Sequence, residues 1–322
     1  MDVESVVENS FGRFCGSFEP LFDSKLEGYI DHPVYCPPIL NRKATKIIRK
    51  SDEACFNDRL LTLYPYSLQK REGILIQIGD GWGEVAPLPG FSKESLADAR
   101  CELLAFAKDQ TPPISPSVKW GLSCALKPYD TSPCEIPLCA YQTPFPGCTH
   151  LKLKVGALSL DQAIEKIRPY VGKYRLRIDC NRSWTLDTAL LFAERFSSSD
   201  FDYLEEPVGS FDDLIRFSSV TQFPVAVDES FREGCAYWKI PTLAAVVVKP
   251  MLLGGIPDLP HVPIILSSSM ETSLGLVQIA RFANPKYCHG LHTFRKDFLS
   301  PPLRADNGRL ITEAHTIDLG LL

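Results

Sequence analysis

The chain has 322 residues, of which 45% are hydrophobic and 23% are charged, proportions that exclude a disordered or fibrous protein and allow two domains. Its formal net charge of −5 gives no basic surface for nucleic acid. No Lys/Arg-rich run or basic amphipathic helix indicates a membrane surface. We therefore expect small molecules or other proteins as partners, and the sequence predicts no oligomeric state.

The N-terminus and the cysteines predict the cellular compartment. The segment MDVESVVENSF lacks the basic and apolar regions of a signal peptide, and no apolar run approaches the roughly 18 residues that span a bilayer. The eleven cysteines are irregularly spaced, without the C-x-x-C pair typical of zinc or redox sites. The pair His289 and His292 has no supporting Cys or carboxylate motif, so we interpret both as ordinary loop or strand residues. These features predict a cytoplasmic protein with reduced thiols.

The N-terminal part combines strand-like and helix-like patterns. Residues 1–57 carry a proline-rich segment and receive no assignment. Residues 60–78 form alternating runs that predict a hairpin with the turn at 79–81. A helix is predicted over 93–109 with Ser92 as its N-cap.

The segment GWGEVAPLPGFS, residues 81–92, is too apolar for an ordinary solvated loop and must pack against other residues. It either covers the core of its own domain or forms a lid over a pocket. Its composition does not decide between these two roles.

Strand-like and helix-like runs alternate from residue 131 onward. The strand-like runs include HLKLKV, RLRID, FDYLE, PVAVD and AAVVVK, with helix-like segments such as LDQAIEKIRPY and LDTALLFAERF between them. This alternation predicts parallel strands with right-handed crossovers. Seven or eight such strands that close on themselves form a TIM-like (β/α) barrel.

Three acidic residues each end a strand-like run. Asp179, Glu205 and Asp228 lie 26 and 23 residues apart, close to the roughly 30 residues that each strand-and-helix unit of a barrel uses. They are therefore expected together at the C-terminal rim of the barrel, where barrel enzymes carry their sites. Three carboxylates suit Mg²⁺, although helix N-caps or an ion-pair network without catalysis remain alternatives.

Lysines lie on the strands before and after these acids. Lys152 and Lys154 share one face of their strand, as do Arg177 and Asp179, because strand side chains alternate. Lys249 ends a later strand. A bound metal ion would act as a Lewis acid on a substrate carboxylate, and a desolvated lysine beside a second positive charge can act as the base.

These residues resemble the enolase superfamily, and within it the o-succinylbenzoate synthases of menaquinone biosynthesis. The motifs of the superfamily branch that uses two lysines are K-x-K (152–154), D-x-N (179–181), EEP (205–207), DES (228–230) and KP (249–250). The phrases GWGEVAPLPGFS (81–92) and SSSMETSLGL (267–276) are more specific to the synthases. The resemblance implies a lyase with a modified TIM-like barrel and an α+β capping domain.

The resemblance also implies roles for the rim residues. Asp179, Glu205 and Asp228 would bind Mg²⁺, with Mn²⁺ as a further candidate. Lys154 would remove the proton alpha to the carboxylate of 2-succinyl-6-hydroxy-2,4-cyclohexadiene-1-carboxylate and then assist loss of the hydroxyl on the same face. Aromatisation makes this syn-dehydration favourable.

The remaining site residues follow from the same resemblance. Lys249 would stabilise the enediolate by its charge, and Lys152 would orient the substrate carboxylate. Groups expected to contact the dicarboxylate substrate are Ser267, Ser268, Ser269, Arg177 and Asn181. For the serines, a structural role as a strand-to-loop cap is the alternative.

The resemblance divides the chain into a capping domain over 58–130, to which residues 295–322 return, and a barrel over 131–294. The lid would be the segment 81–92, with Pro87, Gly90 and Phe91 as its lid residues. Between Lys249 and the next strand at Pro263 lie only 13 residues, rich in Gly and Pro. A parallel crossover normally contains a helix, so we expect the barrel to lack one outer helix there.

Two other functions remain open from the sequence. An N-acylamino acid racemase or dipeptide epimerase of the same superfamily would use Lys154 and Lys249 as opposed bases. A catalytically silent barrel would keep the fold as a binding or structural protein. The retained acids and lysines favour an enzyme.

Overall fold

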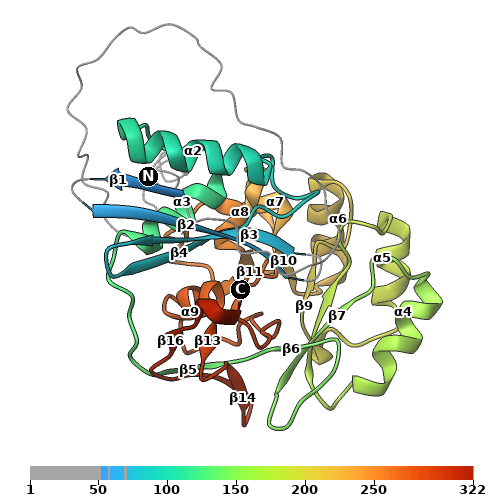
Figure 1. Cartoon of the computed structure of the whole chain (residues 1–322). Coiled ribbons are helices and arrows are strands. Elements are labelled where there is room, and N and C mark those ends of the chain that lie inside the picture. Colours follow the sequence, from blue (N-terminus) through green and yellow to red (C-terminus); the bar gives the residue numbers. More distant parts are fainter. Residues whose placement is uncertain (1–51, 57–58, 69–70, 322) are drawn as a thin grey trace, which may run out of the picture. The chain divides into compact units, whose positions relative to one another are not determined.

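The computed structural model describes residues 52–56, 59–68 and 71–321 (Figure 1). Most of the unassigned segment 1–57 therefore lies outside the described residues. The chain divides into two compact units. Among the described residues, the first comprises those up to Asp130 together with Pro250–Leu259, and the second comprises Thr131–Lys249 together with Pro260–Leu321.

The first unit is an antiparallel sheet covered by helices. Its four strands, in sheet order, are β1 (Asp52–Phe56), β2 (Arg59–Leu68), β3 (Arg71–Ile78) and β4 (Gly81–Val85). The helices are α2 (Leu96–Asp109), α3 (Pro116–Ala125) and the one-turn α8 (Pro250–Leu253). Leu61, Ile76 and Leu103 belong to the core between sheet and helices. Apolar residues on alternate strand positions and on one helix face therefore build this unit.

Two predictions for the first unit need correction. The segment 81–92 is not a loop throughout, because its first five residues form β4 and pair with β3. Helix α2 is capped by Ser95 rather than Ser92: Ser95 Oγ accepts from Asp98 N at 3.1 Å, and Asp98 Oδ2 accepts from Ser95 N at 2.9 Å. This reciprocal pair satisfies two backbone donors at once. The hydroxyl of Ser92 instead accepts from Leu88 N at 2.9 Å and closes the preceding turn.

The second unit contains a seven-stranded parallel sheet with helices between its strands (Figure 1). The strands in spatial order from one edge are β6 (Ala140–Tyr141), β7 (His150–Lys154), β8 (Arg175–Asp179), β9 (Phe201–Glu205), β10 (Val225–Val227), β11 (Leu243–Val248) and β12 (Ile264–Leu266). The longer helices are α4 (Leu160–Ile167), α5 (Leu186–Ala193), α6 (Phe211–Thr221) and α9 (Ser273–Ala280). The predicted alternation of strands and helices is confirmed.

Two crossovers lack a full outer helix. Between β11 and β12 the chain contains only the four-residue α8, so the expected gap after Lys249 is confirmed. Between β10 and β11 it contains only the four-residue α7 (Glu229–Arg232) and the 3-10 turn η3 (Tyr237–Lys239). The outer layer is therefore reduced over a wider part of the barrel than the sequence predicted.

An extended segment closes this sheet into a barrel. His289 makes a parallel bridge to Leu138 beside β6, and Gly290 makes one to Ser267 after β12. Backbone bonds from Cys139 N to His289 O and from Gly290 N to Leu266 O, at 2.9 and 2.8 Å, accompany these bridges. Both edges of the sheet are thereby satisfied, as a barrel requires.

His289 holds this closing segment through its side chain. The fully buried ring accepts from Leu266 N at Nδ1, at 3.0 Å, and donates from Nε2 to Asn284 O, at 2.9 Å. The neighbouring His292 accepts from Tyr141 N at 3.3 Å and packs against Phe145. Both histidines therefore have structural contacts at the barrel seam.

Acid should weaken the fold through His289. Burial lowers the pKa of His289 from 6.5 to about 4, so the folded chain favours the neutral ring that Leu266 and Asn284 require. The free energy of unfolding contributed by this ring is complete above pH 6.5 and is lost as pH falls toward 4, by up to about 3 kcal/mol. Urea denaturation between pH 7.5 and 4.5 measures this loss.

His289→Gln is the matched variant for that experiment, because an amide can accept and donate but does not titrate in this range. Its unfolding free energy should vary less with pH than that of the wild type. An identical pH dependence in both proteins would assign the acid sensitivity to other groups, such as His150, whose pKa burial also lowers to about 4.

The C-terminal segment belongs to the second unit. Asn307 and Gly308, with φ of 43° and 77°, form the predicted turn between β14 (Arg304–Asp306) and β15 (Arg309–Thr312). Strand β15 pairs with β5 (Cys134–Pro137), and the two-stranded sheet of β13 (Leu299–Ser300) and β16 (Thr316–Ile317) lies in the same unit. The expected return of residues 295–322 to the capping domain is therefore wrong, because the open edge of β5 takes up β15.

Candidate active site

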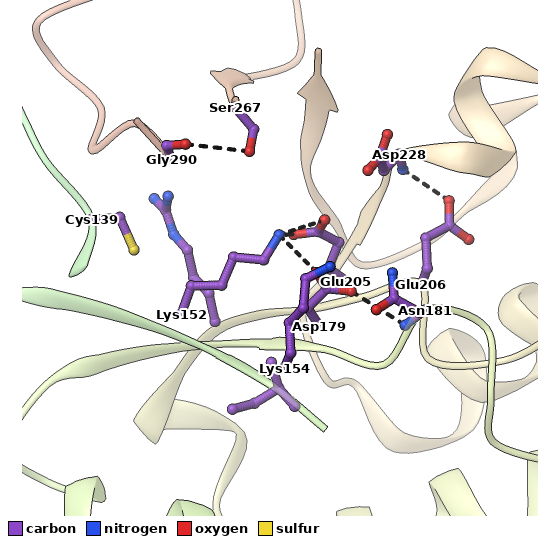
Figure 2. Close-up of polar contacts among 12 residues, drawn as sticks. Cys139, Lys152, Lys154, Asp179, Asn181, Glu205, Glu206, Asp228, Ser267 and Gly290 are labelled. Atoms are coloured by element: carbon purple, nitrogen blue, oxygen red, sulfur yellow. Dashed lines mark hydrogen bonds and ion pairs between the residues drawn. The ribbon is translucent and has the colours of Figure 1, made fainter. Parts of the chain in front are cut away.

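The strand register brings the acids and lysines of the barrel into two layers. Lys154 pairs with Asp179, and Asp179 pairs with Glu205, so these residues occupy one level of three adjacent parallel strands. Lys152 lies one level below, in register with Arg177. Because side chains two positions apart share a face, both levels project their charges to the same side (Figure 2).

Lys152 joins two of the carboxylates directly. Its Nζ lies 2.7 and 2.6 Å from the two carboxylate oxygens of Glu205 and 3.0 Å from Asp179 Oδ2. The side chains of Asp179 and Glu205 are each only 2% exposed. One ammonium group thus compensates two carboxylates whose burial alone would be costly.

The pKa values of this cluster follow from burial and charge. Burial lowers the pKa of Lys152, but Glu205 and Asp179 raise it well above its ordinary value, so Lys152 is a fixed cation. Burial raises the pKa of Glu205 to about 7, against the opposing effect of Lys152. The pKa of Asp179 is lowered, because Lys152 and Lys154 outweigh its burial. These opposite shifts are typical of functional clusters.

The two other lysines differ in their contacts. Lys154 is 41% exposed, and its Nζ lies 3.6 Å from Asp179 Oδ2, too far for a strong hydrogen bond. Lys249 is half-buried, with its side chain 14% exposed, and donates to Asp228 Oδ2. Although burial lowers the pKa of Lys249, Asp228 raises it above the ordinary value. Lys154 is therefore the lysine with the loosest contacts and the best access to a ligand.

The acids provide the oxygen donors that a hard divalent cation requires. Asp179 and Glu205 already converge on one cationic group, the ammonium of Lys152, and Asp228 follows the adjacent strand β10. Within residues 52–56, 59–68 and 71–321, no three His, Cys, Asp or Glu side chains are grouped tightly enough to hold a metal ion. The three carboxylates are the type of donor that a divalent metal takes, and in this arrangement their counter-ions are Lys152 for Asp179 and Glu205 and Lys249 for Asp228.

Of the three predicted substrate serines, Ser268 and Ser269 contact their own loop, and Ser267 contacts the segment that closes the barrel. Ser267 Oγ lies 3.5 Å from Gly290 O, and Ser268 Oγ accepts from Met270 N at 2.7 Å. Ser269 donates from its hydroxyl and its backbone amide to Glu271. These contacts support the strand-to-loop cap that the sequence left open as an alternative.

Arg177 and Asn181 lie at different depths. Arg177 is 3% exposed and is held by Asp202 at 2.7 Å and by Cys288 O at 2.8 Å, with its guanidinium 4.9 Å from the ring centroid of Tyr203. Asn181 is exposed, adopts a left-handed φ of 47°, and donates its backbone N–H to Asp179 Oδ1 at 3.2 Å. Asn181 therefore lies beside the acids, whereas Arg177 lies one level below them, in register with Lys152.

The predicted lid residues form a turn in the first unit. Pro87 O accepts from Arg71 Nη1 at 2.6 Å, Gly90 has a φ of +83°, and Phe91 is 44% exposed. Pro87 and Gly90 border a cavity of about 540 Å³ that is also lined by Glu72 and Lys93. Their role as a lid stays a prediction.

The sequence interpretation gave no role to Glu206, Arg182 or Ser230. Glu206 is 1% exposed, and its carboxylate accepts from the backbone N–H groups of Asp228 and Ser230, at 2.8 and 2.7 Å. Arg182 Nε lies 3.2 Å from the same carboxylate. The available signal was the second acid of the EEP motif, directly after a strand end.

Comparisons with known proteins identify the family. Residues 57–129 match the model of the MenC N-terminal domain, and residues 145–256 match the model of the enolase C-terminal domain-like family. The o-succinylbenzoate synthase of Enterobacter sp. (strain 638) is 35% identical over 269 residues, which cover 70% of this chain and 84% of that protein. The chain belongs to the o-succinylbenzoate synthase family. The Haemophilus influenzae synthase is 33% identical over 287 residues, covering 73% of this chain and 86% of its own.

Solved structures show the same fold as this member of the o-succinylbenzoate synthase family. The synthase from Thermosynechococcus elongatus BP-1 has a TM-score of 0.52 at 20% identity, over 76% of this chain and 91% of its own. A dipeptide epimerase from Enterococcus faecalis V583 has a TM-score of 0.62 at 15% identity, over 82% of this chain and 100% of its own. The modified TIM-like barrel with its α+β domain is confirmed, but the fold does not separate the synthase from the epimerase. None of the described helices is long and apolar enough to cross a membrane.

Proposed function

We propose that this chain is a Mg²⁺-dependent o-succinylbenzoate synthase that dehydrates 2-succinyl-6-hydroxy-2,4-cyclohexadiene-1-carboxylate in menaquinone biosynthesis. The observation that carries the proposal is the row of buried acids with lysines on both sides, in a chain 35% identical to a named synthase. The expected setting is the cytoplasm, and the expected partner is this small dicarboxylate. In this function the first unit serves as the capping domain.

Asp179, Glu205 and Asp228 would hold the metal ion, and the synthase from Thermosynechococcus elongatus was solved with Mg in its active site. When bound, a divalent ion supplies Lewis-acid stabilisation of the substrate carboxylate. Mn²⁺ has the same preference for oxygen donors and is the natural substitute to assay. The chain's own contribution is to keep these three oxygen donors buried at adjacent strand ends.

Lys154 Nζ would take the carbon-bound proton alpha to the carboxylate, and the electron pair of that bond passes into the carboxylate as an enediolate. The positive charge of Lys249 stabilises this dianion, and Lys152 orients the carboxylate. The ammonium of Lys154 then gives its proton to the hydroxyl group on the same face as the C–O bond breaks. Water leaves and the ring becomes aromatic.

A dipeptide epimerase or N-acylamino acid racemase is the second candidate, because an epimerase shares the fold with a TM-score of 0.62. In that reaction Lys154 and Lys249 would exchange an alpha proton on opposite faces. The contacts of the two lysines favour the synthase. Lys249 pairs with Asp228 and keeps its positive charge, whereas Lys154 is the more accessible.

The purified chain should consume the cyclohexadiene substrate with Mg²⁺ and lose this activity in a chelator, as measured by the absorbance of the aromatic product. Exchange of the alpha proton of N-succinylamino acids in deuterated water, without dehydration, would assign the racemase instead. Tight Mg²⁺ binding without turnover of either substrate would indicate a silent barrel.

A further inference from the structure

Glu206 is a buried carboxylate whose hydrogen-bond partners are Asp228, Ser230 and Arg182. It follows Glu205 directly, but its backbone has a left-handed φ of 45°, so the two neighbouring acids serve different contacts. Figure 2 shows the Glu206 side chain directed toward the backbone of Asp228, while Glu205 meets Lys152. Because of this strained backbone conformation, Glu205 points to Lys152 in the site, whereas Glu206 points to the backbone of Asp228.

The Glu206 carboxylate fixes the start of the loop after β10. Its Oε1 accepts from Asp228 N at 2.8 Å and from Ser230 N at 2.7 Å, and its Oε2 accepts from the hydroxyl of Ser230 at 2.8 Å. Asp228 itself has φ −128° and ψ −78°, outside helix and strand, and its side chain makes no helix cap. Glu206 therefore binds the backbone N–H of Asp228, while the carbonyl of Asp228 accepts from Arg232 N at 3.1 Å at the start of α7.

Arg182 completes this network from the loop after β8. Its Nε donates to Glu206 Oε2 at 3.2 Å, its Nη2 donates to Ser230 Oγ at 2.9 Å, and its Nη1 donates to Glu233 at 2.9 Å. The backbone N–H of Arg182 also donates to Glu206 O at 2.8 Å. Arg182 therefore compensates the buried charge of Glu206 and orients it with charge-assisted bonds.

The network links the three loops that follow the acid-bearing strands. Arg182 lies three residues after Asp179, Glu206 one residue after Glu205, and Ser230 two residues after Asp228. We propose that Glu206, oriented by Arg182, is a positioning residue that sets the backbone of Asp228 and thereby the affinity of the site for a divalent cation. This inference rests on the metal site of the proposed function.

The chemistry of Glu206 predicts which variant is informative. Glu206→Gln has almost the same shape, but it loses the negative charge and places an amide donor where Ser230 and Arg182 also donate. Partners of metal ligands typically contribute about 10- to 100-fold to metal affinity. We therefore expect the Kd for Mg²⁺ to rise about 10- to 100-fold in Glu206→Gln, with a smaller rise in Ser230→Ala, which removes one hydroxyl and keeps both backbone bonds.

Mg²⁺ titration calorimetry without substrate, with Mn²⁺ paramagnetic resonance as a second readout, measures this affinity in the full chain. Arg216→Gln is the matched control, because Arg216 is 70% exposed on α6 and pairs with Asp213; it should bind Mg²⁺ like the wild type. At saturating Mg²⁺ the kcat of Glu206→Gln should recover most of its wild-type value, which a general loss of packing would not allow.

A folded Glu206→Gln that binds Mg²⁺ within about twofold of the wild type would overturn the positioning role. If Glu206→Gln does not fold, Ser230→Ala decides by the same criterion. Failure of the proposed function has a different signature: the wild type itself would then neither bind Mg²⁺ nor dehydrate the substrate. A wild type that does both, beside variants with unchanged affinity, would contradict only the inference about Glu206.

Discussion

Lys154→Ala should lower kcat for dehydration by about 10³- to 10⁴-fold, because one side chain both removes the carbon-bound proton and protonates the leaving hydroxyl. The structure supports this assignment through access: Lys154 is 41% exposed and only 3.6 Å from Asp179, whereas Lys152 and Lys249 are committed to buried carboxylates. Steady-state assays at saturating Mg²⁺ measure the loss.

The variant should remain folded and should still bind Mg²⁺. A half-exposed ion pair contributes less than about 1 kcal/mol, so the free energy of unfolding should hardly change. Lys173→Ala, which removes an exposed lysine outside the cluster, is the matched control and should keep full activity. Dehydration that persists in Lys154→Ala would exclude this lysine as the base, and normal kcat in the control excludes a general effect of lost charge.

The positions of Asp179, Glu205 and Asp228 at the rim were predictable from the sequence, because they depend on the pattern of each strand. An acid at the end of an apolar run lies at the rim of a parallel barrel, and the period of two along a strand puts Lys152 and Lys154 on one face. Consecutive parallel strands then bring Lys154, Asp179 and Glu205 into register. Only the contact of Lys152 with two acids at once required the structure.

The hydrogen bonds that Glu206 and Arg182 make around these acids were not predictable, because they depend on contacts between loops. The EEP motif gives no reason why its second acid should turn toward Asp228, since this follows from the left-handed backbone at Glu206 and the nearby Arg182. The Asn-Gly turn at 307–308 likewise predicts a hairpin but not which sheet edge it joins, and β15 joins β5. For Ser95, by contrast, the signal was present: Asp98 stands three residues later.

Lys152→Met should destabilise the chain by about 3 to 5 kcal/mol, because it leaves Asp179 and Glu205 buried without their shared counter-ion. The loss should depend on pH. Burial already raises the pKa of Glu205 to about 7, and removal of the ammonium raises it further, so the folded variant binds a proton that the unfolded chain releases above its ordinary pKa of about 4.5. Stability of the variant should therefore increase as pH falls from 8 to 6.

Mg²⁺ provides a second test of the same variant. A divalent cation at Asp179 and Glu205 supplies the charge that Lys152 no longer provides, and a ligand at about 100 times its Kd adds about 2.7 kcal/mol to the free energy of unfolding. The melting temperature of Lys152→Met should thus rise more with Mg²⁺ than that of Lys173→Met, the matched exposed control. Equal shifts in both variants, with no dependence on pH, would show that Lys152 is not the counter-ion of the metal carboxylates.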